Sequence, residues 1–396
     1  MKKIPLFLAG LFLLTLNGCG GSPGGLNAGT ICRSPEAVTS SLMDDPNVDA
    51  GWGDFRCADL RETDFSGQLD DLFACDFDTK TQWPANLPED FDPAALMELG
   101  RDPGLGVRAL HAQGITGKGV GIAIIDQALL VDHQEYGDRL RLYQEYHSAA
   151  KDSASMHGPA VASIALGETV GVAPEALLYY IADDLGTGTE KNFVRDMSYY
   201  AADIDRFIQL NETLSDGEKI RVISMSVGYM PDTKGAEEMD AAIQRARAAG
   251  IAVVWVGSHD PLMEPWMGMG RRRYGDPNNR GDFRPGAFWE DLLYSGEFRG
   301  ADGSLLLVPM DRRTTASPAG PSEYAYFSEG GTSWTVPWIA GLYALACQVK
   351  PDVTFAEFLD AAQATAEPIS IWRSETEEFP YGKTVNPAAL LEELNT

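Results

Sequence analysis

Three residues of this 396-residue chain have the side chains that nucleophilic acyl transfer needs, namely Asp126, His157 and Ser333. A serine hydroxyl is a weak nucleophile at neutral pH, so a neighbouring imidazole has to take its proton as it attacks a carbonyl. A carboxylate beside the imidazole holds the ring in the correct tautomer and stabilises its cation. If the fold brings these three side chains together, they can hydrolyse an amide or ester bond.

Each of the three residues also has an ordinary structural explanation. Asp126 directly follows the apolar run 121–125, and a carboxylate in that place is commonly a loop or helix cap. His157 begins a small-residue segment, where a histidine commonly caps a helix or packs against a sheet. Ser333 precedes the apolar segment 334–346, so an N-cap role alone also explains it.

The elements around these residues alternate between apolar strands and amphipathic helices. Strands are predicted at 120–125, 176–182, 221–227 and 251–256, and helices at 194–210 and 236–249. Fully apolar strands alternating with helices indicate an α/β fold, with a mainly parallel sheet covered by helices on both faces. In such sheets function collects at the carboxyl ends of the strands, which places Asp126, Ser226 and Ser258 on one edge.

The motifs that hold the three residues resemble those of the subtilisin-like serine proteases, or subtilases. Ala123-Ile-Ile-Asp126 resembles their aspartate block, His157-Gly158 their histidine block, and Gly331-Thr-Ser-Trp-Thr-Val-Pro337 their nucleophile block. The chain order Asp, His, Ser is also that of subtilisin. The resemblance, from about residue 105 to 390, implies a subtilisin-like three-layer fold. It also implies a serine endopeptidase that hydrolyses peptide bonds through an acyl-enzyme on Ser333.

The resemblance extends to the residues that would bind the substrate. Segment 222–228 is similar to the strand along which subtilases lay the substrate backbone. Ser226, Val227 and Gly228 are therefore expected to pair with the peptide and to form one wall of the specificity pocket. Backbone N–H groups at the start of the helix that carries Ser333 would face the developing oxyanion.

One position departs from the subtilase pattern. Subtilases usually carry an asparagine that donates a hydrogen bond to the oxyanion, and Ser258 stands in its place. Losing one such donor costs on the order of 3–4 kcal/mol, a magnitude that comes from subtilisin itself. Three alternatives remain: Ser258 donates directly, His259 swings in, or the enzyme is slow. The alternative function is a catalytically weak or inactive peptide-binding protein with the same fold.

The beginning of the chain has the features of an export signal. Two lysines precede the apolar run 4–16, which is too short to span a bilayer comfortably and is typical of a signal peptide at 1–18. The segment Leu-Asn-Gly-Cys19 resembles a bacterial lipobox, which implies cleavage before Cys19 and its lipidation; the alternative is an ordinary signal peptide. The glycine-rich segment 19–30 is predicted to be a flexible tether. We therefore expect an extracytoplasmic lipoprotein anchored to a bacterial membrane.

The remaining sequence divides into two regions. Residues 31–104 are acidic and lack helical periodicity, and are predicted to form a small N-terminal region packed on a peptidase domain at 105–396. Segment 58–65 resembles a pentapeptide-repeat turn, but it is too short for a solenoid. The stretch 261–300 is either a solvated surface loop or a substrate-recognition element at the rim of the active site.

Composition restricts the partners. A formal net charge of -27 repels nucleic acid and anionic lipid, so neither is an expected ligand. The subtilase resemblance implies a peptide or protein substrate, and the lipobox resemblance implies a membrane contact through the lipid anchor alone. The chemistry requires no cofactor. The histidines and acidic residues show no metal-ligand spacing, and structural calcium is left open. Four cysteines follow Cys19, and their spacing assigns no disulfide.

Overall fold

The computed structural model describes residues 53–147, 153–187, 193–257, 259–295, 303–372 and 378–396. The predicted signal peptide, the tether, Cys19 and Ser258 lie outside the described residues. In the described part, every helix is either too short or too polar to cross a lipid bilayer. The cysteines of that part, Cys57, Cys75 and Cys347, carry free thiols.

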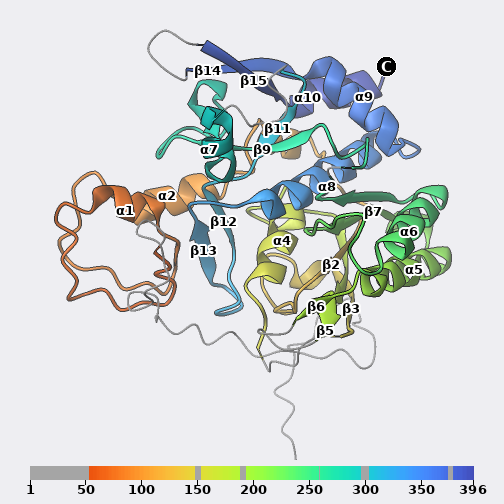
Figure 1. Cartoon of the computed structure of the whole chain (residues 1–396), viewed down its shortest axis with the longest axis horizontal. Helices are drawn as coiled ribbons and strands as arrows, with labels where there is room; N and C mark the ends of the chain where they lie inside the picture. The colour runs from red at the N-terminus through yellow and green to blue at the C-terminus, as the bar shows by residue number, and fades with distance from the viewer. Residues whose placement is uncertain (1–52, 148–152, 188–192, 258, 296–302, 373–377) are drawn as a thin grey trace, which may run out of the picture.

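A five-stranded sheet forms the centre of the molecule (Figure 1). In spatial order its strands are β3 (Leu140–Glu145), β4 (Leu177–Ala182), β2 (Gly121–Asp126), β7 (Ile220–Met225) and β8 (Ala252–Trp255). All neighbouring pairs are parallel. Every residue of β2 is buried, as expected for a strand that is covered on both faces. The predicted parallel sheet is therefore confirmed.

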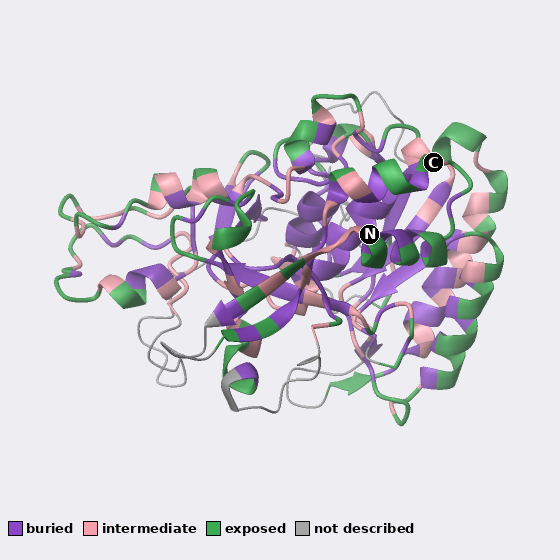
Figure 2. Ribbon diagram, turned by 90° about the horizontal axis from the view of Figure 1, so that it is seen from above, coloured by how far each residue is buried: buried purple, intermediate pink, exposed green. Residues whose placement is uncertain are grey.

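Two pairs of helices cover this sheet. On one face lie α4 (His157–Leu166) and α8 (Thr332–Val349), and on the other lie α5 (Ser198–Thr213) and α6 (Ala236–Ala248). Residues 334–347 of α8 are buried without interruption, which is typical of a helix inside a large core (Figure 2). Helix α4, which begins at His157, and helix α8, which carries Ser333 in its first turn, thus lie on the same face of the sheet and pack on each other.

Two predicted boundaries are wrong, for local reasons. The helix predicted from 194 begins at Ser198, because β6 (Val194–Arg195) pairs with β5 (Gly186–Thr187) as a small hairpin. The strand predicted over 221–227 ends at Met225, where the N–H of Val227 donates to the Met225 carbonyl at 2.8 Å. This turn takes Ser226 and Val227 out of the strand and leaves them at its carboxyl end.

The stretch after residue 260 contributes to a second sheet, so the prediction of a solvated loop is wrong for most of it. This sheet has the order β10 (Phe283–Pro285), β9 (Trp266–Arg271), β11 (Leu306–Pro309), β15 (Glu378–Thr384) and β14 (Glu367–Trp372). Helix α7 (Ala287–Ser295) follows β10, and its Leu293 is fully buried. Three further helices are α3 (Val107–His111), α9 (Phe355–Thr365) and α10 (Pro387–Leu394).

The N-terminal region joins a third sheet. Its strand β1 (Phe77–Asp78) pairs antiparallel with β13 (Tyr324–Phe327), which pairs in turn with β12 (Arg313–Ala316). Helices α1 (Leu69–Ala74) and α2 (Pro93–Gly100) belong to the same region, which projects to the left in Figure 1. Short 3₁₀ turns lie at η2 (Gly137–Arg139), η3 (Asp216–Glu218) and η4 (Arg280–Asp282).

The N-terminal region contains a pattern, an aspartate followed by an apolar residue, that recurs every five positions from residue 54 to residue 65. Phe55, Leu60 and Phe65 share one apolar cluster with Phe77 and with Tyr326 of β13. The aspartate before each of the first three, at positions 54, 59 and 64, accepts a hydrogen bond from the N–H two residues further on. Such turns reverse the chain without regular strands, which explains why this region shows little secondary structure.

Candidate active site

A carboxylate and an imidazole meet at the carboxyl end of the central strand β2. Asp126 ends β2 with only 4% of its surface exposed, and its Oδ1 accepts a hydrogen bond from the N–H of Gln127 at 2.8 Å. Nδ1 of His157, the first residue of α4, lies 2.6 Å from the same oxygen. The imidazole is 21% exposed. In the part of the chain that the structure describes, its Nε2 forms no hydrogen bond and is available to a reacting group.

This short contact depends on a glycine. A Cβ atom at Gly158 would lie 2.5 Å from the carbonyl oxygen of Gln127 and 2.5 Å from the hydroxyl of Tyr180. Both distances are below the closest approach of real Cβ atoms, so any other residue would push the start of α4 away from β2. The glycine after His157 therefore permits the close approach that brings the imidazole to Asp126.

Burial and charge act in opposite directions on the imidazole. Burial alone would lower the pKa of His157, but attraction by the Asp126 carboxylate and the hydrogen bond to it outweigh burial. The pKa of His157 is thus raised above its ordinary value of 6.5. Below the unfolded-state pKa this pair contributes its full stability, which is lost as pH rises through the folded-state pKa. The neutral form, which can act as a base, predominates only above that pKa, and its fraction falls about tenfold per pH unit below it.

Ser333 lies in the first turn of α8, next to the end of β7. Gly331 precedes the helix with φ +61°, a conformation that favours glycine. The Ser333 hydroxyl is 3.5 Å from the carbonyl of Ser226, and the hydroxyl of Ser226 donates to the carbonyl of Ser333 at 2.9 Å. The first N–H groups of a helix lack partners within the helix and form its positive end. The turn that carries Ser333 is therefore suited to an anion.

Ser333 and His157 lie near each other but are not hydrogen-bonded to each other. The ring of Trp334, the residue after Ser333, lies 5.5 Å from the ring of His157, centroid to centroid. Among the described residues, the Ser333 hydroxyl has the Ser226 carbonyl as its partner and makes no hydrogen bond with His157. Catalytic hydrogen bonds are often long or unformed before a substrate binds.

The residues expected to bind the substrate backbone lie directly after β7. Ser226 contacts Ser333, as described above. The carbonyl of Val227 accepts a hydrogen bond from the N–H of Val256 at 3.0 Å. The carbonyl of Gly228 accepts one from the guanidinium of Arg195, an exposed residue, at 3.1 Å. A peptide that pairs with Gly228 would thus have to displace a side chain from the β6 hairpin.

His259, which follows the expected oxyanion donor Ser258, is held in place by neighbouring side chains. The ring of His259 packs edge-on against Tyr229 and Trp255, with centroids 5.3 Å and 5.0 Å away. Its Nε2 lies 3.8 Å from Asp240. A swing of His259 toward an oxyanion would break these contacts, which argues against this alternative. Ser258 itself lies outside the described residues.

Two features near the site had no signal in the sequence. A second pair, His147 and Asp183, is joined at 2.8 Å, and the N–H of Asp183 donates to the Asp126 carbonyl at 2.9 Å. Asp311 is buried and accepts the N–H of Gly330, three residues before Ser333, at 3.1 Å. Neither aspartate belongs to a recognisable motif, because each acts on a backbone group that only the fold brings near.

No group of three or more metal-ligating side chains occurs among the described residues. The sequence left metal binding open, and the described part adds no candidate metal centre.

Three comparisons with known proteins bear on this site. Residues 117–260 match the profile of the subtilase family, Peptidase_S8, and this stretch holds Asp126 and His157 but not Ser333. Over 309 residues the chain is 27% identical to the subtilisin-like protease PopC of Myxococcus xanthus (strain DK1622). This alignment covers 71% of this chain and 62% of PopC. The structure of the prenylagaramide maturation protease PagA is similar with a TM-score of 0.50 and 18% identity, over 73% of this chain and 98% of that chain.

These likenesses confirm the predicted fold class, a subtilisin-like three-layer α/β fold. Residues 117–260 of the chain thus resemble the subtilase family, and the chain spans less than two thirds of the length of PopC.

The paired carboxylate makes a prediction for the titration of His157. In Asp126→Asn the imidazole loses the attraction of the charge but keeps an oxygen acceptor, so burial becomes the larger influence on its pKa. We expect the pKa of His157 to fall from above 6.5 to below it. NMR titration of labelled imidazoles, with His157→Gln to assign the resonance, measures this value. Asp138→Asn, which changes an exposed carboxylate, is the control and should leave it unchanged. An unchanged pKa in Asp126→Asn would contradict the pairing.

Proposed function

We propose that the protein is a serine endopeptidase that cleaves peptide bonds with Asp126, His157 and Ser333 as its catalytic triad. The observation that carries the proposal is the 2.6 Å hydrogen bond between Asp126 and His157, with Nε2 of the same imidazole left available. Ser333 stands on the neighbouring helix α8, which packs on α4. The similarity to a subtilisin-like protease supports this reaction type.

The proposed reaction begins with a change of side-chain position at Ser333. Its hydroxyl leaves the Ser226 carbonyl by rotation about χ1 and hydrogen-bonds to Nε2 of His157. As the oxygen attacks the substrate carbonyl, Nε2 takes its proton, and Asp126 stabilises the resulting imidazolium. The negative charge on the former carbonyl oxygen faces the N–H groups at the start of α8.

The bond to the leaving amine then breaks. His157 gives its proton to the departing nitrogen, and the acyl group remains on Ser333. Water then attacks the acyl-enzyme with His157 again as the base, which releases the acid and restores the hydroxyl. In this proposal the peptide lies along Ser226, Val227 and Gly228. The carbonyl of Gly228 becomes free for pairing when Arg195 moves away.

A phosphonate probe that reacts with activated serines tests this function. We expect the wild-type protein to be labelled covalently at Ser333, because only a serine with a neighbouring base is nucleophilic enough to react. Ser333→Ala and His157→Ala should abolish labelling. Ser322→Ala, which changes an exposed serine near β13, is the matched control and should label like the wild type. Mass spectrometry of the labelled peptide measures the result, and folded wild-type protein that stays unlabelled would refute the proposal.

A second candidate function is a peptide-binding protein with weak or absent catalysis. Two observations favour it: serine replaces asparagine at position 258, and the Ser333 hydroxyl faces the Ser226 carbonyl. Labelling kinetics of Ser258→Asn distinguish the two candidates. If an oxyanion donor is missing, restoring the amide should speed labelling by about tenfold or more. An equal rate in the variant and the wild type would show that other groups already supply the donor.

We also propose that the protein is an exported lipoprotein, tethered to a bacterial membrane through Cys19. The lysines, the apolar run and the lipobox-like segment that precede Cys19 support this location. The intact mass and the N-terminal peptide of protein isolated from cells should show a chain that begins at a lipid-modified Cys19. Cys19→Ala should release the protein from the membrane fraction. An unmodified Cys19, or a mature chain that begins elsewhere, would contradict the anchor.

A further inference from the structure

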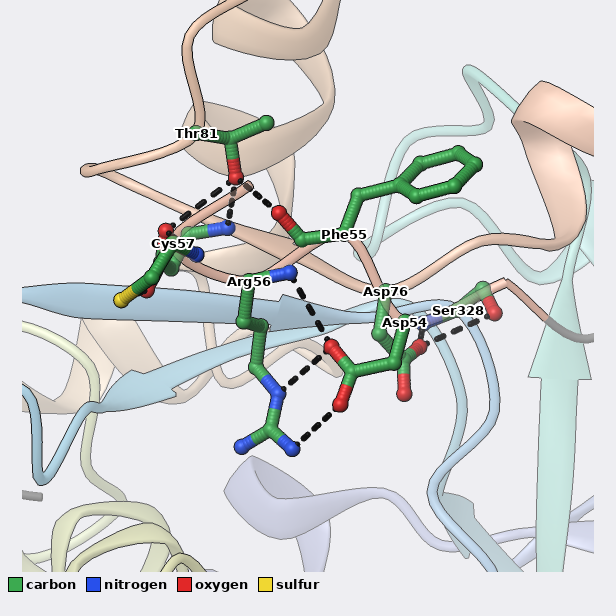
Figure 3. A network of polar contacts seen from close by, with 8 residues as sticks. Asp54, Phe55, Arg56, Cys57, Asp76, Thr81 and Ser328 are labelled. Carbon is green, nitrogen blue, oxygen red and sulfur yellow. Dashed lines mark hydrogen bonds and ion pairs between the residues drawn. The ribbon is translucent and has the colours of Figure 1, made fainter. Parts of the chain in front are cut away.

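The segment that leads from β13 to α8 is held by two aspartates from different parts of the chain. The N–H of Ser328 donates to Oδ1 of Asp76 at 2.9 Å, as Figure 3 shows. Two residues later, the N–H of Gly330 donates to Oδ1 of Asp311 at 3.1 Å. Asp311 belongs to the peptidase domain, whereas Asp76 belongs to the N-terminal region. The nucleophile segment, residues 328–333, is therefore fixed in part by the N-terminal region.

The hydroxyl of Ser328 adds to the same contact. It donates to the carbonyl of Ala74 at 2.7 Å and lies 3.2 Å from Oδ1 of Asp76. Ala74 is the last residue of α1, and Asp76 lies between α1 and β1, so both partners of Ser328 come from the N-terminal region. Two residues outside the peptidase domain therefore accept the hydrogen bonds of Ser328, Asp76 from its N–H and Ala74 from its hydroxyl.

Asp76 is itself fixed by its own backbone. Its N–H donates to the carbonyl of Gly53 at 2.8 Å, and its carbonyl accepts the N–H of Phe55 at 2.7 Å. Next to this bridge, Arg56 and Asp54 form an ion pair at 2.6 Å (Figure 3). These contacts leave the Asp76 carboxylate little freedom to move away from Ser328.

The N-terminal region is attached to the peptidase domain along its length. The rings of Phe77 and Tyr326 stack at 4.9 Å across the β1–β13 pair. The hydroxyl of Thr314 in β12 donates to the carbonyl of Met97 at 2.6 Å. The hydroxyl of Tyr274 donates to the carbonyl of Asp90 at 3.0 Å. The region therefore contributes a strand, and not only a surface contact, to the peptidase domain.

A cavity of about 720 Å³ lies between these parts. Phe73 and Asp70 of the N-terminal region line it together with Arg272 and Glu329, and Glu329 lies four residues before Ser333. Removal of the N-terminal region would take away one wall of this cavity and would expose the edge of β13. It would also leave the N–H and hydroxyl of Ser328 without their acceptors.

We infer that the N-terminal region is a permanent part of the catalytic unit and that Asp76 is a positioning residue for the nucleophile segment. The inference rests on the proposed role of Ser333 as the nucleophile. Asp76 does not touch the reacting atoms. It acts through Ser328, whose position sets the start of the segment that turns into α8. A region that is removed during maturation could not fulfil this role.

Hydrogen exchange tests the positioning without reference to activity. In Asp76→Ala, the amides of residues 328–333 should exchange at least about tenfold faster than in the wild type, because Ser328 has lost its acceptor. Exchange in α4 should stay the same. Glu62→Ala, which removes an exposed carboxylate from the same region, is the matched control and should change neither. Unchanged exchange of residues 328–333 in Asp76→Ala would overturn the inference.

Kinetics test the consequence for catalysis. Asp76→Ala should lower kcat and the rate of phosphonate labelling by about tenfold while KM stays within about twofold, because the nucleophile and not the binding surface is displaced. Asp76→Asn keeps an acceptor oxygen and should restore most of the rate. If Asp76→Ala does not fold, Ser328→Ala takes its place, with faster exchange and slower labelling expected from the lost hydroxyl contact.

The outcomes separate this inference from the proposed function. A wild-type protein that is never labelled would refute the proposed function, whereas exchange would still report whether Asp76 holds the segment. Labelling and exchange that are unchanged in Asp76→Ala would refute the positioning role alone. An active mature form that begins after residue 100 would overturn the permanence of the N-terminal region.

Discussion

The hydrogen bond between Asp126 and His157 is the interaction on which the rest of the site depends. A carboxylate that is 4% exposed needs a partner, since an unpaired buried charge is strongly destabilising. The N–H of Gln127 supplies one hydrogen bond and His157 supplies the other, at 2.6 Å. The same contact fixes which nitrogen of the imidazole points away from Asp126. Stability and the proposed chemistry therefore impose the same geometry.

The parallel sheet explains how distant residues come together. The carboxyl ends of neighbouring parallel strands lie along one edge, so Asp126 after β2 and Ser226 after β7 are close although a hundred positions separate them. Helices α4 and α8 pack on the same face and bring His157 and Ser333 to this edge. The N-terminal region contacts the segment before Ser333 from outside this sheet, through Asp76 and Ser328.

The strongest local signals in the sequence predicted the central fold correctly. Runs such as 121–125 are apolar throughout, and a strand buried on both faces needs such a run whatever lies around it. The triad positions came from short motifs, and the structure joins two of the three residues directly. Prediction failed where a contact joins distant segments. Two examples are the sheet that 266–285 forms with the C-terminal strands, and the bonds of Asp76 and Asp311 to the nucleophile segment. Neither leaves a local pattern in the sequence.

In the proposed reaction His157, with its pKa raised by Asp126, is the base for Ser333. The most direct test is the rate of phosphonate labelling as a function of pH, compared with the NMR titration of His157 in the same protein. If His157 is the base, the rate should rise about tenfold per pH unit and level off at the pKa of His157, above 6.5. A rate that does not depend on pH, or that levels off away from that pKa, would contradict it.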